Sequence, residues 1–164
     1  KLESMFKEIV IVTNKPDEYV KYNCILAEDE VKDFGPVAGI SVGLKHSSSM
    51  YNYIIACDMP YVNSSYIDFM KAEIAKQEND VDAVITRLGD WIEPFNAFYS
   101  KSLIVKAEEN IRLGRRRINS LFKDSNVIYI SEAKAREYST NWEMFMNLNT
   151  VKDYEDAIKS ITGI

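Results

Sequence analysis

The chain is poor in the residues that most often carry acid–base and metal chemistry. Its 164 residues include one histidine, His46, and two cysteines, Cys24 and Cys57. One histidine leaves too little material for a histidine-based triad. Two cysteines beside apolar segments fit buried, reduced thiols better than a disulfide framework or a zinc knuckle. Any catalysis must therefore depend on carboxylates, cations or a bound metal ion.

Positive charge and long apolar runs are also scarce. The 20 lysines and arginines are outnumbered by 25 acidic residues, which gives a net charge of −5. Nucleic acid and anionic membrane surfaces attract clustered positive charge, so the composition argues against both as the main partner. No run approaches the roughly 18 apolar residues of a membrane span, and the first residues lack the pattern of a secretion signal. We expect a soluble, cytoplasmic protein.

Short apolar runs alternate with helical patterns along most of the chain. With 46% hydrophobic residues and no linker or internal repeat, the sequence predicts one domain around a sizeable core. The alternation predicts an α/β fold with a doubly wound, mainly parallel sheet covered by helices on both faces, which is a three-layer arrangement. The expected strands are 8–13, 24–27, 53–57, 82–86, 95–99 and 127–130, and the expected helices are 37–45, 66–78, 101–113, 116–122 and 151–161.

The strongest local signal is an apolar run that ends in a carboxylate. Residues 53–57 read Tyr-Ile-Ile-Ala-Cys, Asp58 follows, and Pro60 stops the run. A buried parallel strand of this kind presents its last side chain at the carboxyl edge of the sheet, where open α/β folds bind ligands. We predict Asp58 as a metal ligand. The alternative is a structural aspartate that caps a helix or holds a loop.

A second candidate is the turn before the helix expected at 37–45. Gly35 and Pro36 are followed closely by Ala38 and Gly39. Proline favours the first position of a helix, and small residues let a ligand approach the backbone. The free N–H groups and the positive dipole end of such a helix suit an anionic ligand. The alternative is tight packing of this helix on the sheet.

Seven short segments occur in order along most of the chain. They are the strand ending at Asn14, Ala-Glu-Asp at 27–29, Gly-Pro-Val-Ala-Gly at 35–39, Cys-Asp-Met-Pro at 57–60, Glu-Pro-Phe-Asn-Ala-Phe-Tyr at 93–99, Arg-Arg-Arg-Ile at 115–118 and Asn-Leu-Asn-Thr at 147–150. In this order and spacing they resemble the motifs of the molybdenum cofactor guanylyltransferase family, the MobA-like branch of the nucleotidyltransferases.

The resemblance implies a nucleotidyl transfer with a Rossmann-like nucleotidyltransferase fold. A terminal phosphate of molybdopterin would attack the α-phosphate of GTP, releasing pyrophosphate and forming a dinucleotide. A phosphate nucleophile needs no strong general base, which agrees with the scarcity of histidine. The partners implied are GTP and molybdopterin as substrates, with transient contact to the molybdenum enzymes that receive the product. The cofactor implied is Mg²⁺.

The family motifs also imply residue roles. Asp58 would be the catalytic residue that holds Mg²⁺ against the triphosphate, because a hard cation prefers carboxylate and phosphate oxygens. The nucleotide-binding residues would be Asn14, Asp29, Gly35, Pro36, Ala38 and Gly39. The acceptor substrate would face Arg115, Arg116, Asn147 and Asn149. Structural alternatives stay open: a turn at Asp29, a helix cap at Asn149-Thr150, and a solvated basic turn at 115–117.

Two departures from the family pattern affect these predictions. Asn96 stands where the family has a histidine, a replacement that would loosen or alter contacts to the second substrate. The family's glycine-rich triphosphate loop does not occur in the sequence, which resembles a domain starting in the helix after that loop, about 30 residues in. A doubly wound sheet without its first strand would expose backbone and core to water. We therefore expect residues 1–164 to be one nucleotidyltransferase domain that lacks its N-terminal part.

Two other classes of function fit the same residues. Nothing in them selects guanine over cytosine, so a cytidylyltransferase for the same pterin shares the pattern, as does a transferase acting on a sugar or alcohol phosphate. A non-catalytic relative that binds a nucleotide without turnover is the other alternative. Thermal stabilisation by each nucleoside triphosphate would distinguish these functions.

Overall fold

Helices pack around two β-sheets in an α/β arrangement. The structure is a computed structural model that describes residues 1–28, 31 and 34–162. Its strands are β1 (Val10–Val12), β2 (Ile25–Ala27), β3 (Tyr51–Ile54), β4 (Ala83–Leu88), β5 (Trp91–Ser100) and β6 (Val127–Ser131). Its α-helices are α1 (Pro36–His46), α2 (Ser64–Ala75), α3 (Leu103–Arg112), α4 (Glu132–Arg136) and α5 (Val151–Thr162). Short 3₁₀ turns are η1 (Leu2–Ser4), η2 (Pro16–Glu18), η3 (Ile118–Leu121) and η4 (Glu143–Phe145).

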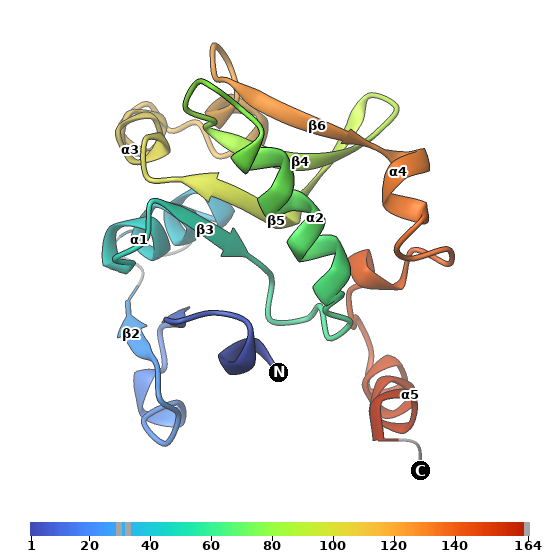
Figure 1. Cartoon of the computed structure of the whole chain (residues 1–164). Helices are drawn as coiled ribbons and strands as arrows, with labels where there is room; N and C mark the ends of the chain where they lie inside the picture. Colours follow the sequence, from blue (N-terminus) through green and yellow to red (C-terminus); the bar gives the residue numbers. More distant parts are fainter. Residues whose placement is uncertain (29–30, 32–33, 163–164) are drawn as a thin grey trace.

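The strands form a small sheet and a larger one (Figure 1). β1 and β2 pair in parallel, with Val10 opposite Ile25. The larger sheet has the order β3-β5-β4-β6. β4 and β6 are parallel, whereas β5 runs antiparallel to both β3 and β4. β3, β4 and β6 of the larger sheet share one direction and β5 runs against them, and the predicted α/β fold class is confirmed.

Successive residues of β4 face opposite sides of the larger sheet. Ala83 and Ile85 belong to a core cluster shared with α1, α3 and η3, whereas Val84 belongs to a cluster shared with α2, α4 and η4. This alternation is the period-2 pattern of a strand buried on both faces. It places helices on both sides of the sheet and produces the predicted three layers.

The strand predicted at 53–57 is wrong in its position. β3 ends at Ile54, which pairs with Ala97 of β5, so Asp58 lies beyond the strand. Asn96, the residue before Ala97 in β5, has a φ of 56°. This left-handed conformation bends β5 away from the extended path and ends its pairing with β3.

The two cysteines are free, but neither is buried. Cys24 is partly exposed, and Cys57 is exposed. The prediction of buried thiols is wrong because the chain leaves the sheet before Cys57, which takes this side chain out of the core. In the part of the chain that the structure describes, no helix combines the length and the apolarity needed to cross a membrane.

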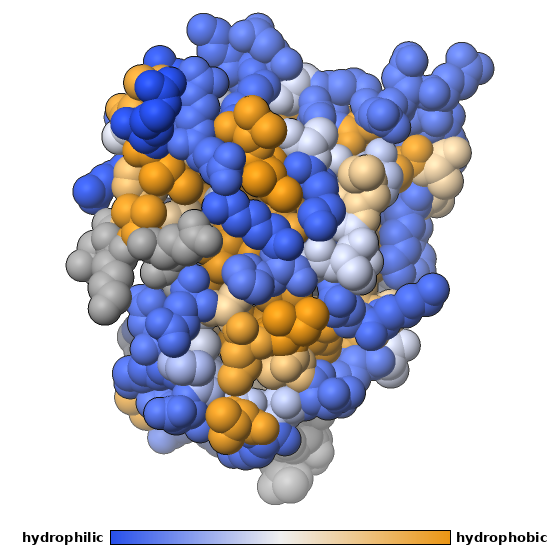
Figure 2. Space-filling model, turned by 90° about the vertical axis from the view of Figure 1, so that its left-hand side faces the viewer, coloured by the Kyte–Doolittle hydropathy of each residue, from blue (hydrophilic) through white to orange (hydrophobic). Residues whose placement is uncertain are grey.

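On the side of the molecule that carries α1, β2 and α3, the described residues form no continuous apolar face. Figure 2 shows hydrophobic residues gathered there in separate patches, divided by hydrophilic residues. Val105 and Leu113, near the two ends of the α3 segment, are exposed. Scattered exposed hydrophobic residues are normal on protein surfaces.

Candidate functional site

Asp58 lies in a tight turn after β3. The Met59 amide donates to the Ala56 carbonyl oxygen at 3.1 Å, which closes the turn. Oδ1 of the Asp58 carboxylate is buried and has no hydrogen-bond partner among the described residues. A buried carboxylate oxygen without a partner is energetically costly. Such an oxygen is suited to a cation that arrives with a ligand.

The segment Asn147–Asn149 lies against this turn. The Leu148 amide donates to the Asp58 carbonyl oxygen at 2.8 Å. Leu148 is half-buried, and the asparagines on either side of it are exposed. The structure therefore brings together three predicted site residues, Asp58, Asn147 and Asn149, from distant parts of the chain.

The same segment is fixed at its other end by α5. The Asp153 carboxylate accepts the amides of Asn149, at 3.0 Å, and Thr150, at 2.9 Å, and the Thr150 hydroxyl oxygen accepts the Asp153 amide at 3.1 Å. This is a reciprocal helix cap. Hydrogen bonds from the Thr150 side chain and the Asn149 amide hold the pKa of the Asp153 carboxyl below its usual value. Thr150 thus caps the helix. The Asn149 side chain is exposed, and its Nδ2 donates one long hydrogen bond, 3.5 Å, to the Asn147 carbonyl oxygen.

The predicted nucleotide-binding turn lies at the N-terminus of α1. Gly35 precedes the helix with a φ of 99°, a conformation that favours glycine, and Pro36 occupies the first turn. Ala38 is fully buried in the core, so helix packing explains this small residue. Packing does not explain Gly39, because a Cβ atom there would meet nothing within 4 Å. The helix start therefore leaves open space beside Gly39.

Arg116 lies beside the segment that precedes α1. Its guanidinium group is 5.4 Å from the ring centroid of Phe34, the residue before Gly35. Among the described residues, no hydrogen bond or ion pair joins Arg115, Arg116 or Arg117 to Asp58. The structure consequently places Arg116 beside the predicted nucleotide-binding turn, whereas the sequence grouped it with the acceptor residues.

Arg116 and its two neighbours, Arg115 and Arg117, line a hollow at the turn after α3. Gly114 ends this helix region with a φ of 69°, and the Arg115 amide donates to the Asn110 carbonyl oxygen at 2.8 Å. A shallow hollow of about 390 Å³ follows, lined by Gly114, Arg115, Arg116, Arg117 and Ser120. Clustered guanidinium groups in such a hollow suit a phosphate.

Asn14, another predicted nucleotide-binding residue, lies just after β1 of the small sheet. The Thr13 amide donates to the Ala27 carbonyl oxygen at 2.9 Å, which holds the ends of β1 and β2 side by side. Asn14 is exposed immediately after this contact. Asp29, the other predicted guanine-binding residue, lies outside the described residues.

The donor chemistry of Asp58 fits a magnesium ion. Within residues 1–28, 31 and 34–162, no group of three or more histidine, cysteine, aspartate or glutamate side chains could hold a metal ion. A closed protein cage is therefore not available there. Mg²⁺ commonly binds through one or two carboxylates together with substrate phosphates and water, so one orphan carboxylate oxygen is compatible with it.

Sequence reasoning missed the partners of Asn96. This residue is only 1% exposed, accepts a hydrogen bond from the Tyr53 hydroxyl, and donates through Nδ2 to the Met144 carbonyl oxygen at 3.1 Å. Any influence of Asn96 on a substrate is consequently indirect. The signal in the sequence was an amide side chain inside the apolar run 95–99, since a buried amide requires partners.

Comparisons with known proteins identify one family. The family model of the MobA-like NTP transferase domain matches residues 1–129. A probable molybdenum cofactor guanylyltransferase from Peptoclostridium acidaminophilum is 45% identical over 156 residues, which cover 93% of this chain and 71% of the relative. A molybdenum cofactor guanylyltransferase from Syntrophotalea carbinolica is 42% identical over 154 residues, which cover 94% and 72%.

A solved structure has the same fold. The crystal structure of molybdopterin-guanine dinucleotide biosynthesis protein A from Archaeoglobus fulgidus matches with a TM-score of 0.74 and 28% identity, over 94% of this chain and 79% of that chain. The predicted resemblance of the chain to the molybdenum cofactor guanylyltransferase family is confirmed. The chain belongs to the family of MobA-like NTP transferase domains.

Proposed function

We propose that this chain acts in a cytoplasmic guanylyltransferase that moves GMP from GTP to a phosphate of molybdopterin. The observation that carries the proposal is the hydrogen bond from Leu148 to the Asp58 carbonyl. This contact sets a carboxylate with an unpartnered oxygen beside two exposed asparagine side chains. Relatives at 45% and 42% identity that bear the name molybdenum cofactor guanylyltransferase support the choice of reaction.

The reaction asks for positioning more than for proton transfer. An oxygen of the terminal phosphate of molybdopterin forms a bond to the α-phosphorus of GTP. The bond from that phosphorus to the oxygen bridging to the β-phosphate breaks, and pyrophosphate leaves with the electron pair. The attacking phosphate oxygen is already anionic, so no side chain has to remove a proton. A chain with one histidine can therefore support this reaction.

Charge neutralisation and alignment fall to named residues. Asp58 would hold Mg²⁺, which supplies positive charge to the triphosphate and the leaving pyrophosphate. The start of α1, with Gly35 and Gly39, would approach the nucleotide phosphates through backbone N–H groups. Arg116, beside this turn, would add a guanidinium donor.

The amides at 147 and 149 would orient the acceptor. Asn147 and Asn149 each carry a donor and an acceptor group toward solvent beside Asp58, which suits a pterin edge or a phosphate. The guanine edge would meet Asn14 and Asp29, since a carboxylate can accept paired N–H donors.

Thermal unfolding with GTP and CTP, each with and without Mg²⁺, tests the proposal. We expect GTP to raise the unfolding temperature only when Mg²⁺ is present, since ligand at about 100 times its Kd adds roughly 2.7 kcal/mol. The Asp58→Asn variant should lose the part of the shift that depends on Mg²⁺. A shift with CTP alone would establish a cytidylyltransferase instead. Absence of a shift with either nucleotide would contradict nucleotide transfer.

A further inference from the structure

Two segments converge on the Asp58 site, and each carries part of it. The first arm, residues 51–58, contains β3 and ends at Asp58. The second arm, residues 142–149, contains η4 and carries Asn147 and Asn149 in its last three residues. The two arms touch where Leu148 donates to the Asp58 carbonyl oxygen. The relative position of the carboxylate and the two amides depends on how these arms are held.

One buried side chain, from a third segment, binds both arms. Asn96 of β5 accepts a hydrogen bond from Tyr53 on the first arm and donates one to Met144 on the second. We call these three residues the Asn96 clasp. Because Asn96 is 1% exposed, water has little access to compete for either bond.

The backbone at this junction is held in an uncommon conformation. Asn96 has a φ of 56°, and Trp142, at the start of the second arm, has a φ of 66°. Left-handed conformations of residues other than glycine persist where the surrounding contacts over-determine them, and they cluster at functional sites.

The hydroxyl of Tyr53 is aimed by its ring contacts. The ring stacks on Phe6, with centroids 5.4 Å apart and planes at 14°, and packs against Phe98 at 5.5 Å. Phe6 follows η1 and Phe98 belongs to β5. Both contacts hold the ring without involving its hydroxyl. Removing the hydroxyl alone is therefore a mild change to the packing of the first arm.

We propose that Asn96 is a positioning residue, which holds Asp58 on one arm and Asn147–Asn149 on the other in the relative arrangement that the site requires. The effect on turnover rests on the proposed function, whereas the effect on geometry does not. A misplacement of about 1 Å at a reacting centre can cost about 100-fold in rate. Loss of either hydrogen bond of the clasp should consequently slow transfer without direct contact to a substrate.

Tyr53→Phe and Asn96→Gly test the clasp. Tyr53→Phe keeps the ring and leaves Asn96 Oδ1 without its donor, and Asn96→Gly removes both hydrogen bonds while tolerating the positive φ. The matched control is Tyr66→Phe, which removes another buried tyrosine hydroxyl from the same core cluster. Its partner is Thr86, which belongs to neither arm.

The first readout is hydrogen exchange at the Leu148 amide, without any ligand. We expect both clasp variants to speed this exchange about tenfold, the effect of losing a hydrogen bond near the upper end of its net range. Tyr66→Phe should leave the exchange rate of Leu148 unchanged. Unchanged exchange in folded Tyr53→Phe, or equal acceleration in Tyr66→Phe, would overturn the positioning role.

The second readout is the kinetics of GMP transfer. We expect the clasp variants to lower kcat while the KM for GTP stays unchanged, because the α1 turn is not part of the clasp. If wild-type protein transfers no nucleotide but Tyr53→Phe speeds Leu148 exchange, the proposed function fails and the clasp geometry is supported. If wild-type protein transfers GMP and Tyr53→Phe matches it in both readouts, the function holds and the positioning role is overturned.

Discussion

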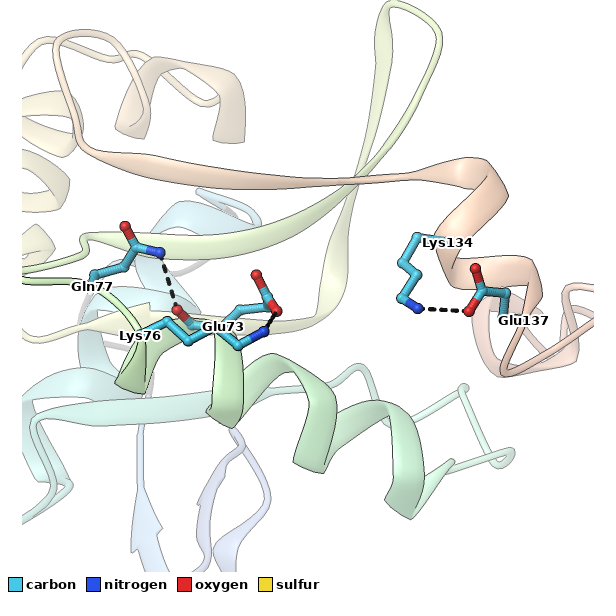
Figure 3. Close-up of polar contacts among 5 residues, drawn as sticks. All are labelled: Glu73, Lys76, Gln77, Lys134 and Glu137. Carbon is cyan, nitrogen blue, oxygen red and sulfur yellow. Dashed lines mark hydrogen bonds and ion pairs between the residues drawn. The ribbon is translucent and has the colours of Figure 1, made fainter.

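The Asn96 clasp and the ion pairs of α2 and α4 are polar contacts of opposite character. The clasp centres on the buried Asn96 side chain and joins residues 43 and 48 positions apart in the sequence. The ion pairs Glu73–Lys76 and Lys134–Glu137 lie on the surface and join residues three positions apart (Figure 3). Water screens the surface pairs, whereas the clasp lies where an unmade hydrogen bond is costly. Polar contacts therefore position the proposed site in the Asn96 clasp, whereas those on α2 and α4 contribute little to stability.

The charged side chains of the surface region lie beside aromatic rings. Lys134 of α4 lies 5.2 Å from the ring centroid of Phe69 on α2, and the Phe69 and Tyr138 rings stack at 5.3 Å. The hydrogen bond to Glu137 raises the pKa of the Lys134 amine. The lysine thus covers apolar rings while its charge stays in water.

The largest contrast between the two regions is expected from removing one carboxylate in each. Under the proposed function, Asp58→Asn should reduce transfer by more than about 100-fold, since metal-ion stabilisation of transition-state charge is worth several kcal/mol. Glu73→Gln on α2 should leave turnover unchanged. Pyrophosphate release measures both variants. Retained turnover in Asp58→Asn would remove this residue from the metal role.

Alanine and glycine should rank in opposite orders at the two sites. The Asn96→Ala variant should be less stable than Asn96→Gly by about 1 kcal/mol, because a Cβ atom disfavours the φ of 56°. At Lys71, exposed in the middle of α2, glycine should be less stable than alanine by about 1 kcal/mol. Urea unfolding of the four variants gives both differences. The same order at both sites would show that the backbone at 96 is unstrained.

Alkaline pH should lower the free energy of unfolding, because buried tyrosine hydroxyls resist ionisation in the folded protein. Burial raises the pKa of Tyr66 to about 12, partly offset by the hydrogen bond with Thr86, and burial also raises the pKa of Tyr53. A raised pKa means that this stabilisation is complete below the unfolded value, about 10, and is lost as the pH rises through the folded value.

The pH dependence has a measurable slope. Each such tyrosine should lower the free energy of unfolding by up to about 1.4 kcal/mol per pH unit above about pH 10. Tyr66→Phe should therefore show a flatter curve than wild type when unfolding is followed across this range. Equal slopes would mean that Tyr66 ionises as readily in the folded protein as in the unfolded chain.

The smallest effect is expected at the surface ion pair of α2. Lys76→Gln should change the free energy of unfolding by less than about 0.5 kcal/mol, and by less again at about 1 M salt. The loss caused by Tyr53→Phe should be independent of salt, since its hydrogen bond joins two neutral groups. A salt-sensitive loss in Tyr53→Phe would place the clasp in contact with solvent charge.

Local patterns predicted most elements but misjudged where strands end. The runs at 24–27, 82–86 and 127–130 lie in β2, β4 and β6 with small shifts of their bounds. α4 was missed, because its five residues are too few to show a helical period. The end of β3 was also missed, since it depends on a bend in β5 that no local pattern of residues 53–57 reveals.

The sequence by itself determined the α/β class, the candidates Asp58, Asn147 and Asn149, and the capping of α5, because hydrophobic period and side-chain chemistry act over a few residues. The tertiary structure decided which candidates meet. The hydrogen bond from Leu148 to Asp58, the contact of Arg116 with Phe34 before α1, and the burial of Asn96 between the two arms all depend on it. These contacts join residues far apart in the chain, so they exist only once the antiparallel path of β5 and the packing on both faces of the sheet are established.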